Sequence, residues 1–337
     1  MHIYEMGYQG EERHDLARVT AVWRGRLDLM TEEGPRNGIM RGMWDKLPVT
    51  GDFVQICPLD GETCLAEGIL PRRTVFERRD PTVGRDKGVQ AVAANFDTVF
   101  IVTSLNGDFS TRRLERYLTL AWQSGGEPVF VLTKKDLCPH AETLKKAAEA
   151  LGAPALCISA KTGEGMEQLD PWLQPGKTTA LLGSSGVGKS SLVNALMGEN
   201  VMKTNVTRQV DESKGRHTTT HRELLFLANG AMLIDTPGMR EMGMWDVSEG
   251  LEKAFPEVEA LLNKCRFRNC RHESEPGCAV KMAIENGEVT RERVMQYFQL
   301  KKEARFSDDP GGVLREKYER NKAIAKAMRL QRNGRGK

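Results

Sequence analysis

The chain has 337 residues, of which 39% are hydrophobic and 28% are charged, so it is long enough for two or three domains with a substantial core. No apolar run approaches the roughly 20 residues that a bilayer-spanning helix needs, and the N-terminus lacks the basic and then apolar pattern of a signal peptide. These features argue against a membrane protein, and we expect a soluble cytoplasmic protein with no membrane partner.

The net charge of +3 is unevenly distributed along the chain. The last 27 residues, 311–337, contain nine Lys or Arg and two Glu, a sum of +7, which leaves −4 for the rest. A basic tail on a slightly acidic body predicts an anionic partner such as RNA. A solvated helical tail without a particular partner is the alternative that the tail alone leaves open.

The first 75 residues are rich in strand signals. Residues 18–30, 48–56 and 64–78 alternate apolar and polar side chains, with turn residues between them and no convincing helix. Short strands of this kind predict a small β-barrel or a sandwich.

From about residue 91 the pattern changes to apolar strands that alternate with amphipathic helices. The expected strands are 97–105, 128–133, 155–160, 178–185, 222–228 and 231–237, and the expected helices are 111–125, 141–152 and 189–198. This alternation predicts a mostly parallel sheet covered on both faces. Ligands of such sheets bind at the C-terminal ends of the strands. After about residue 244 the pattern is helical.

A phosphate-binding loop follows the strand 178–185. The sequence GSSGVGKS matches G-x-x-x-x-G-K-[ST], with a strand before it and a helix after it. Its glycines let backbone N–H groups wrap phosphates at the start of a helix. We expect Lys189 to bridge the β- and γ-phosphates, Ser190 to ligate Mg²⁺ and Ser191 to lie beside the α-phosphate. The predicted nucleotide contacts of this loop are Gly183, Ser184, Ser185, Gly186, Val187, Gly188, Lys189, Ser190 and Ser191.

Two further segments resemble the switch regions of GTPases. Asp235 ends a strand and begins D-T-P-G, which resembles D-x-x-G, so we expect Asp235 to hold Mg²⁺ and the Gly238 N–H to sense the γ-phosphate. A threonine-rich loop, residues 215–224, resembles the first switch, in which one threonine completes the Mg²⁺ shell. Thr219 is the first choice and Thr218 the second, because spacing alone does not decide between them.

A guanine-reading motif comes earlier in the chain. Thr133, Lys134, Lys135 and Asp136 match N/T-K-x-D at the end of one strand, and Ser159, Ala160 and Lys161 match S-A-K at the end of the next. Asp136 would accept hydrogen bonds from guanine N1–H and the 2-amino group, a donor pattern that adenine lacks. The site therefore predicts guanine specificity and disfavours an ATP-dependent kinase.

The order of these motifs is base motif, S-A-K, phosphate loop, first switch and D-x-x-G. An ordinary GTPase begins with the phosphate loop and ends with S-A-K, so the present order is a circular permutation, with the original ends joined near residues 172–178. The second switch then leads directly into the C-terminal region.

A cluster of metal-ligand residues lies in that C-terminal region. Cys265, Cys270, His272 and Cys278 form C-x₄-C-x-H-x₅-C, which would fill a closed tetrahedral zinc site. Free thiols are the alternative. The other four cysteines, at positions 57, 64, 138 and 157, are scattered and do not suggest a disulfide framework.

The strand-rich N-terminus, the permuted GTPase motifs and the zinc knuckle together resemble the ribosome small-subunit-dependent GTPase A family over nearly the whole chain. The resemblance implies an α/β protein with a circularly permuted P-loop GTPase domain, an OB-fold barrel before it and a mainly helical zinc domain after it. We place these domains at residues 76–245, 1–75 and 246–337. The family further implies GTP hydrolysis stimulated by the small (30S) ribosomal subunit, contact with 16S rRNA and a role in late subunit maturation. We expect a monomer that uses GTP/GDP, Mg²⁺ and one Zn²⁺ per chain.

The group that positions the attacking water has two candidates. Ras-like GTPases orient the attacking water with a glutamine after D-x-x-G. This chain has Met239 there, so it should hydrolyse GTP slowly by itself. Either His217 or groups of the bound ribosome would supply the missing function, and an exposed loop histidine is the simpler interpretation of His217. A GTP-regulated rRNA-binding placeholder, in which hydrolysis is incidental, is the alternative to a GTPase whose hydrolysis drives release.

Overall fold

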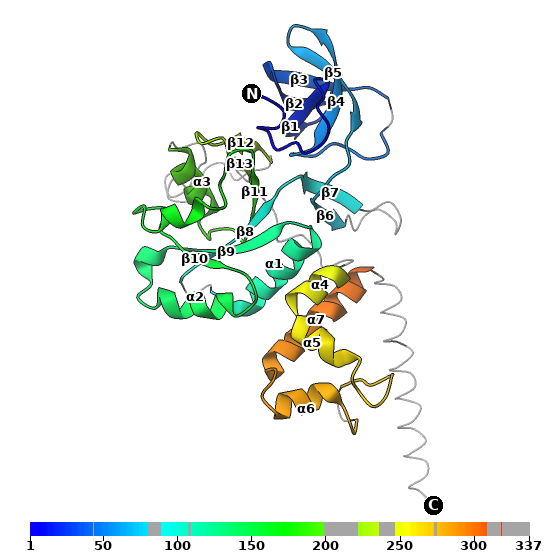
Figure 1. Ribbon diagram of the computed structural model, residues 1–337, viewed down its shortest axis with the longest axis vertical. Coiled ribbons are helices and arrows are strands. Elements are labelled where there is room, and N and C mark those ends of the chain that lie inside the picture. The colour runs from blue at the N-terminus through cyan, green and yellow to red at the C-terminus, as the bar shows by residue number, and fades with distance from the viewer. Residues whose placement is uncertain are drawn as a thin grey trace, which may run out of the picture. The chain divides into compact units, whose positions relative to one another are not determined.

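The computed structural model describes residues 1–42, 44–79, 89–106, 109–198, 222–235, 247–272, 275–308 and 318. The chain divides into two compact units, Met1–Met242 and Gly243–Lys337 (Figure 1), and each is described by itself. None of the described helices has both the length and the apolar character needed to cross a membrane.

The N-terminal part of the first unit is a closed five-stranded barrel. Its strands are β1 (Leu16–Trp23), β2 (Arg26–Thr31), β3 (Gly34–Met40), β4 (Phe53–Asp60) and β5 (Thr63–Ile69). They are ordered β1-β2-β3-β5-β4, β3 is parallel to β5, and β4 closes the barrel against β1. A closed five-stranded barrel is OB-like, so the structure confirms the barrel and excludes the sandwich.

The rest of this unit is built on a six-stranded sheet in the order β10-β9-β8-β11-β13-β12. Its strands are β8 (Thr98–Ser104), β9 (Glu127–Thr133), β10 (Ala155–Cys157), β11 (Thr178–Leu182), β12 (Leu224–Phe226) and β13 (Met232–Asp235). All neighbours pair in parallel except β12 with β13, which confirms the predicted mostly parallel sheet. A small two-stranded sheet of β6 (Val75–Arg79) and β7 (Val89–Ala94) accompanies it.

Helices cover both faces of this sheet. Helix α1 (Thr111–Gln123) buries Leu114, Tyr117, Leu118 and Ala121, the i, i+3, i+4, i+7 positions of one face. In Figure 1, α1 and α2 (Ala141–Glu149) lie on one side of the sheet and α3 (Lys189–Met197) lies on the other. Two short 3₁₀ turns, η1 (Lys135–Leu137) and η2 (Met166–Leu169), complete the unit.

A buried arginine joins the barrel to the sheet. The Arg18 side chain on β1 is fully buried and donates hydrogen bonds to the Met6 and Asn95 carbonyl oxygens. Its guanidinium lies 4.7 Å from the centroid of the Phe53 ring and 3.7 Å from the Met232 sulfur of β13. Burial lowers the Arg18 pKa to about 9, so the side chain still carries its charge at neutral pH.

The second unit contains α4 (Ser248–Ala254), α5 (Pro256–Leu262), α6 (Ala279–Glu285) and α7 (Arg291–Asp308). Phe255 and Tyr297 pack edge to face at 5.7 Å, and the Arg293 guanidinium lies 4.1 Å from the Phe255 ring centroid. This unit is helical, as the sequence predicted. Apart from Tyr318, the basic tail from Gly311 lies outside the described residues. The domain limits placed after residues 75 and 245 remain predictions.

Candidate functional site

The predicted guanine and phosphate motifs come together at one edge of the sheet. Strand β8 lies between β9, which ends in Thr133, and β11, which leads into Gly183. Because these three strands are parallel, the loops that follow them emerge side by side.

The phosphate loop has the backbone that its glycines were predicted to provide. Gly186 and Gly188 have φ angles of +83° and +103°, in the left-handed region that favours glycine. A side chain at Gly183 would place its Cβ 2.3 Å from the Val102 carbonyl oxygen, so the loop could not run so close to β8 with any other residue. Val187 is buried in the core, whereas Ser185 and Gly186 are exposed.

Lys189 begins α3 and reaches back over the loop. Its Nζ donates to the Gly183 and Ser184 carbonyl oxygens at 2.6 and 2.9 Å. These contacts hold the ammonium inside the curve of the loop. Ser190 and Ser191 occupy the first turn of α3, where free backbone N–H groups and the helix dipole favour an anion.

The base motif is tied directly to this loop. The Thr133 hydroxyl donates to the Val187 carbonyl oxygen and also lies 3.2 Å from that of Thr103. Lys134 Nζ donates to the Gly186 carbonyl oxygen at 3.1 Å. Lys134 itself has a left-handed backbone (φ 61°, ψ 38°), which is uncommon for a residue with a side chain and is typical of functional sites.

Asp136 and the S-A-K segment form the third part of the site. Asp136 is exposed, and its Oδ1 accepts a hydrogen bond of 2.7 Å from the buried Ser159 hydroxyl. Ala160 and Lys161 follow at increasing exposure. The carboxylate is therefore oriented by the protein but remains open to a ligand, as a guanine-reading aspartate requires.

Sequence reasoning missed one residue of this region. Glu164, three positions after S-A-K, forms an ion pair of 2.9 Å with Lys135. This partner raises the pKa of the Lys135 ammonium above its ordinary value. No spacing rule links positions 135 and 164, and only the resemblance to S-A-K could have directed attention to the residues after it.

Asp235 lies at the end of β13 and is suited to a cation. It is buried, and its Oδ1 has no hydrogen-bond partner among the described residues. Burial raises the pKa of Asp235, and the nearby Lys189 partly opposes this effect. A buried carboxylate oxygen without a partner is destabilising by itself, so Mg²⁺ or its bound water fits this position.

Several predicted residues fall outside the described part of the chain. These are the catalytic candidate His217, the alternative Mg²⁺ ligands Thr218 and Thr219, the switch residue Gly238 and Met239. Their proposed roles remain predictions from the sequence.

The four predicted zinc ligands of the second unit converge. One ligand atom from each of Cys265, Cys270, His272 and Cys278 lies within 4.8 Å of all the others. His272 Nδ1 is 3.5 Å from the Cys265 sulfur and 3.6 Å from the Cys278 sulfur. A tetrahedral zinc ion with ordinary Zn–S and Zn–N bonds separates such ligands by about 3.6 Å, so the cluster could hold one zinc ion.

The surroundings of this cluster shift the pKa values of its thiols in opposite directions, and burial raises the pKa of Cys270 to about 11. Burial by itself would raise the pKa of Cys265, but hydrogen bonds from the Ala279 and Val280 backbone and from neighbouring thiols bring its pKa below the ordinary value. The His272 ring stacks on Phe298 at 5.4 Å, which fixes its orientation. Contacts that orient the ligand side chains in this way are usual around structural metal sites.

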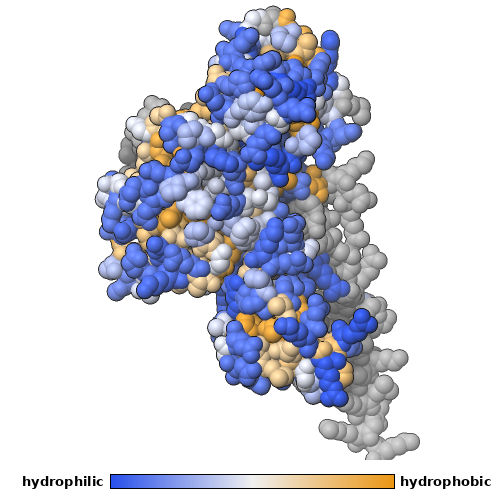
Figure 2. Space-filling view, viewed as in Figure 1, coloured by the Kyte–Doolittle hydropathy of each residue, from blue (hydrophilic) through white to orange (hydrophobic). Residues whose placement is uncertain are grey.

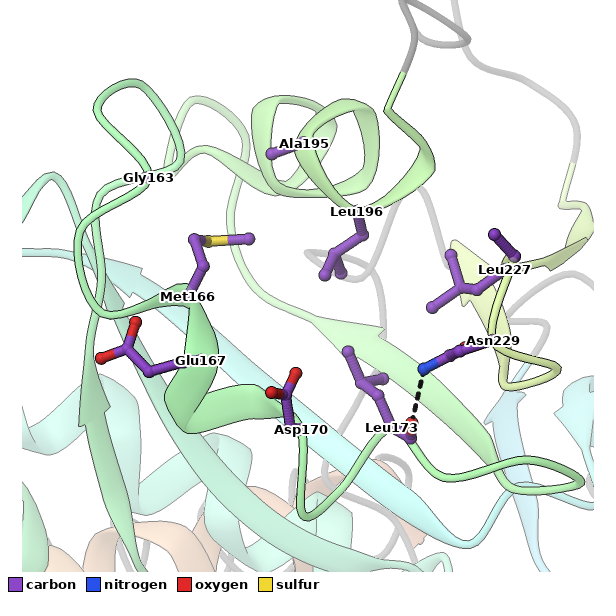
Figure 3. Close-up of a pocket in the computed structure, with 10 residues that line it drawn as sticks. Gly163, Met166, Glu167, Asp170, Leu173, Ala195, Leu196, Leu227 and Asn229 are labelled. Carbon is purple, nitrogen blue, oxygen red and sulfur yellow. Dashed lines mark hydrogen bonds between the residues drawn. The ribbon is translucent and has the colours of Figure 1, made fainter.

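A cavity of about 480 Å³ lies between the η2 region, the end of α3 and the segment that follows β12. Figure 3 shows Met166, Leu173, Leu196 and Leu227 around it, and the Asn229 side-chain amide donates to the Leu173 carbonyl oxygen at 2.9 Å. No predicted nucleotide contact in the described part of the chain is among its lining residues. In the surface view of Figure 2, hydrophilic residues dominate the visible face and apolar residues occur in small groups.

Sequence comparisons identify close relatives of the chain. A model of the RsgA GTPase family matches residues 69–245. The chain is 43% identical over 322 residues to the small ribosomal subunit biogenesis GTPase RsgA 2 of Listeria monocytogenes, covering 93% of this chain and 90% of that protein. It is 45% identical over 298 residues to the small ribosomal subunit biogenesis GTPase RsgA of Methanosarcina acetivorans, covering 87% and 80%.

Solved structures with a similar fold point to the same kind of protein. The fold is similar to YjeQ from Thermotoga maritima, with a TM-score of 0.61 and 28% identity over 85% of this chain and 96% of that one. It is also similar to YloQ, described as a circularly permuted GTPase, with a TM-score of 0.60 and 24% identity over 87% and 97%, which supports the fold. The motif order, the sheet and the full-length relatives lead to one conclusion: the chain belongs to the RsgA GTPase family, whose GTPase domain is circularly permuted.

Proposed function

We propose that this GTPase binds the small ribosomal subunit through 16S rRNA, acts in the cytoplasm late in subunit maturation, and is released when it hydrolyses GTP. Its relatives carry the name small ribosomal subunit biogenesis GTPase, and they match nearly the whole chain. A monomer suffices for this role, since the guanine and phosphate motifs described above all come from one chain.

One observation carries the nucleotide assignment. Thr133 and Lys134 of the base motif contact the Val187 and Gly186 carbonyl groups of the phosphate loop, although these segments lie more than 50 positions apart. A guanine nucleotide has both a guanine base and phosphates, so it is the ligand that suits a site in which a guanine-reading loop contacts a phosphate loop.

The individual roles follow from this arrangement. Asp136 reads the guanine edge, and Lys134 lies along the base. The segment Ser159–Lys161 backs the base, and Gly183–Ser191 surround the phosphates with Lys189 as their cation. Charge neutralisation by preorganised groups of this kind is the main catalytic device of phosphoryl transfer.

Two metals complete the proposal. Mg²⁺ would be held by Ser190, Asp235 and Thr219, and it would neutralise charge on the β- and γ-phosphates. One zinc ion would be held by Cys265, Cys270, His272 and Cys278, where it stabilises the second unit rather than taking part in hydrolysis.

Hydrolysis by the chain alone should be slow. Met239 stands where Ras-like GTPases have the glutamine that orients water, and its thioether cannot do so. We assign this task to His217 or to groups of the bound subunit. The second switch leads along the chain into the zinc region. When the γ-phosphate leaves, Gly238 would no longer be held against it, and the segment that leads into the zinc region would be released.

A titration of the GTPase rate against purified 30S subunits tests the proposal. The expected result is a low rate for the chain alone and a saturable rise with added subunits. Binding of 30S subunits without any stimulation would support the alternative, an rRNA-binding placeholder in which hydrolysis is incidental. If 30S subunits neither bind the chain nor stimulate its GTPase rate, the proposal is refuted.

A further inference from the structure

Glu164 connects the two loops that enclose the guanine site. Its carboxylate pairs with Lys135 Nζ at 2.9 Å, and its carbonyl oxygen accepts a hydrogen bond of 2.8 Å from the Ser159 N–H. Lys135 precedes Asp136, and the Ser159 hydroxyl donates to the Asp136 carboxylate at 2.7 Å. Glu164 thus contacts both Lys135, which precedes Asp136 in the chain, and Ser159, which donates a hydrogen bond to Asp136.

The backbone around Glu164 is shaped for this position. It lies between Gly163 and Gly165, whose φ angles are +81° and +76°. A Cβ at Gly165 would come within 2.4 Å of the Cys157 carbonyl oxygen at the end of β10, so only glycine permits this approach. The Gly163 N–H closes the loop on the Ser159 carbonyl oxygen at 2.9 Å. The direction of Glu164 is therefore set by the chain on both sides.

The loop that Glu164 restrains is strained. Lys134 has a left-handed backbone, a conformation that persists only when its surroundings hold it. The restraints are the Lys134 and Thr133 contacts to the phosphate loop, the Lys135 N–H bond of 3.0 Å to the Ile158 carbonyl oxygen, and the Lys135–Glu164 ion pair. Two side-chain contacts join the loops that would flank the base: the hydrogen bond from the Ser159 hydroxyl to Asp136 and the Lys135–Glu164 ion pair.

We propose that Glu164 is a positioning residue for guanine recognition: its ion pair with Lys135 holds the Ser159–Gly163 loop against the base motif and so slows the release of a bound guanine nucleotide. This inference rests on the proposed function, since it assumes that the two loops enclose guanine. It adds a residue outside the base motif and S-A-K, and it makes nucleotide release dependent on salt.

The test is the dissociation rate of a fluorescent GDP analogue from the full-length protein. The side chains of Lys135 and Glu164 are 28% and 53% exposed, so the pair is of the weak, partly solvated kind. Glu164→Gln should therefore speed release by about 1.5- to 5-fold. Raising the salt concentration should speed release from the wild type more than it speeds release from the variant, because salt screens the ion pair in addition to the phosphate contacts that both proteins share.

A double-mutant cycle and a matched control separate positioning from stability. Lys135→Met combined with Glu164→Gln should release the analogue no faster than the faster single variant, since both remove one interaction. Glu149→Gln breaks another partly exposed pair of the same unit, with Lys145 at 3.8 Å, and should leave release unchanged. The melting temperature of Glu164→Gln should match that of Glu149→Gln.

Two failures are distinguishable. If the wild type binds GDP and Asp136→Asn weakens that binding, but Glu164→Gln releases the analogue at the wild-type rate and with the wild-type salt dependence, this inference is overturned and the proposed function stands. Independent, multiplying effects in the double variant would overturn it as well. If the wild type binds no guanine nucleotide, the proposed function fails and the inference fails with it.

Discussion

Asp136→Asn is the most direct test of the guanine site. In the structure, one carboxylate oxygen of Asp136 accepts the Ser159 hydroxyl at 2.7 Å. The substituted amide can keep its oxygen toward Ser159, which turns its NH₂ group to the position of the second carboxylate oxygen. A hydrogen-bond acceptor for the base is thereby replaced by a donor.

The loss can be estimated from the bonds involved. Guanine would present N1–H and its 2-amino group to Asp136, and a hydrogen bond to a charged group contributes about 1.5–3 kcal/mol. In the variant, the NH₂ group of the asparagine faces an N–H donor of guanine, so one bond is lost and the other is weakened. The expected cost is about 2–4 kcal/mol of binding free energy. At 1.4 kcal/mol per tenfold change, GDP affinity should fall about 25- to 700-fold.

Calorimetry with GDP and with xanthosine diphosphate measures this effect. Xanthine has an oxygen where guanine has the 2-amino group, so xanthosine diphosphate should bind the variant better than the wild type. Asp170→Asn, another exposed aspartate of the same unit, is the control and should bind GDP normally. Unchanged GDP affinity in Asp136→Asn would remove this residue from the site and refute the reasoning.

The other predictions concern the phosphate loop, the metals and the coupling to the ribosome. Lys189→Ala should abolish 30S-stimulated GTP hydrolysis while circular dichroism remains that of the wild type; retained stimulation would contradict the phosphate-loop assignment. Metal analysis of protein purified without chelator should find about one zinc per chain, and Cys278→Ser should lower that content; less than a tenth of an equivalent in the wild type would exclude the site. Burial raises the pKa of Asp235, so the folded nucleotide-free protein binds more protons than the unfolded chain, and its free energy of unfolding should fall as the pH rises above the ordinary aspartate value. Asp235→Asn should remove this pH-dependent fall in the free energy of unfolding. In urea unfolding at pH 7 without magnesium, the variant should be more stable than the wild type, and a less stable variant would contradict the reasoning. Affinity for 30S subunits should be higher with a non-hydrolysable GTP analogue than with GDP, and equal affinities would contradict the coupling through the second switch.

The sequence was informative where local chemistry determines structure. The strands β8, β9, β11 and β13 are apolar runs that end in motif residues, and in a parallel sheet the ends of neighbouring strands meet. That Thr133, Asp136 and Lys189 follow strands of one sheet could therefore be expected from the strand ends together with the resemblance of their motifs to those of GTPases.

Contacts between distant segments could not be predicted in this way. The Lys135–Glu164 ion pair depends on how two loops curve, and no periodicity encodes that. Arg18 occupies a position in an alternating strand pattern that predicts exposure, yet the N-terminal segment and the sheet cover that outer face of the barrel. Strand β3 (Gly34–Met40) was missed as well, since its glycines and proline weaken the strand pattern.

The burial of Arg18 has a consequence for how the first unit unfolds. Its charge has no carboxylate partner in direct contact among the described residues. Its contacts come from four separate segments: the Met6 carbonyl of the N-terminus, the Phe53 ring of the barrel, the Asn95 carbonyl that precedes β8 and the Met232 sulfur of β13. Removing any of these segments takes away part of the compensation of a buried cation, and an uncompensated buried charge costs several kcal/mol. The barrel and the sheet should therefore melt in a single cooperative transition, and a fragment that ends after β5 should lack the stability that the barrel has in the whole chain.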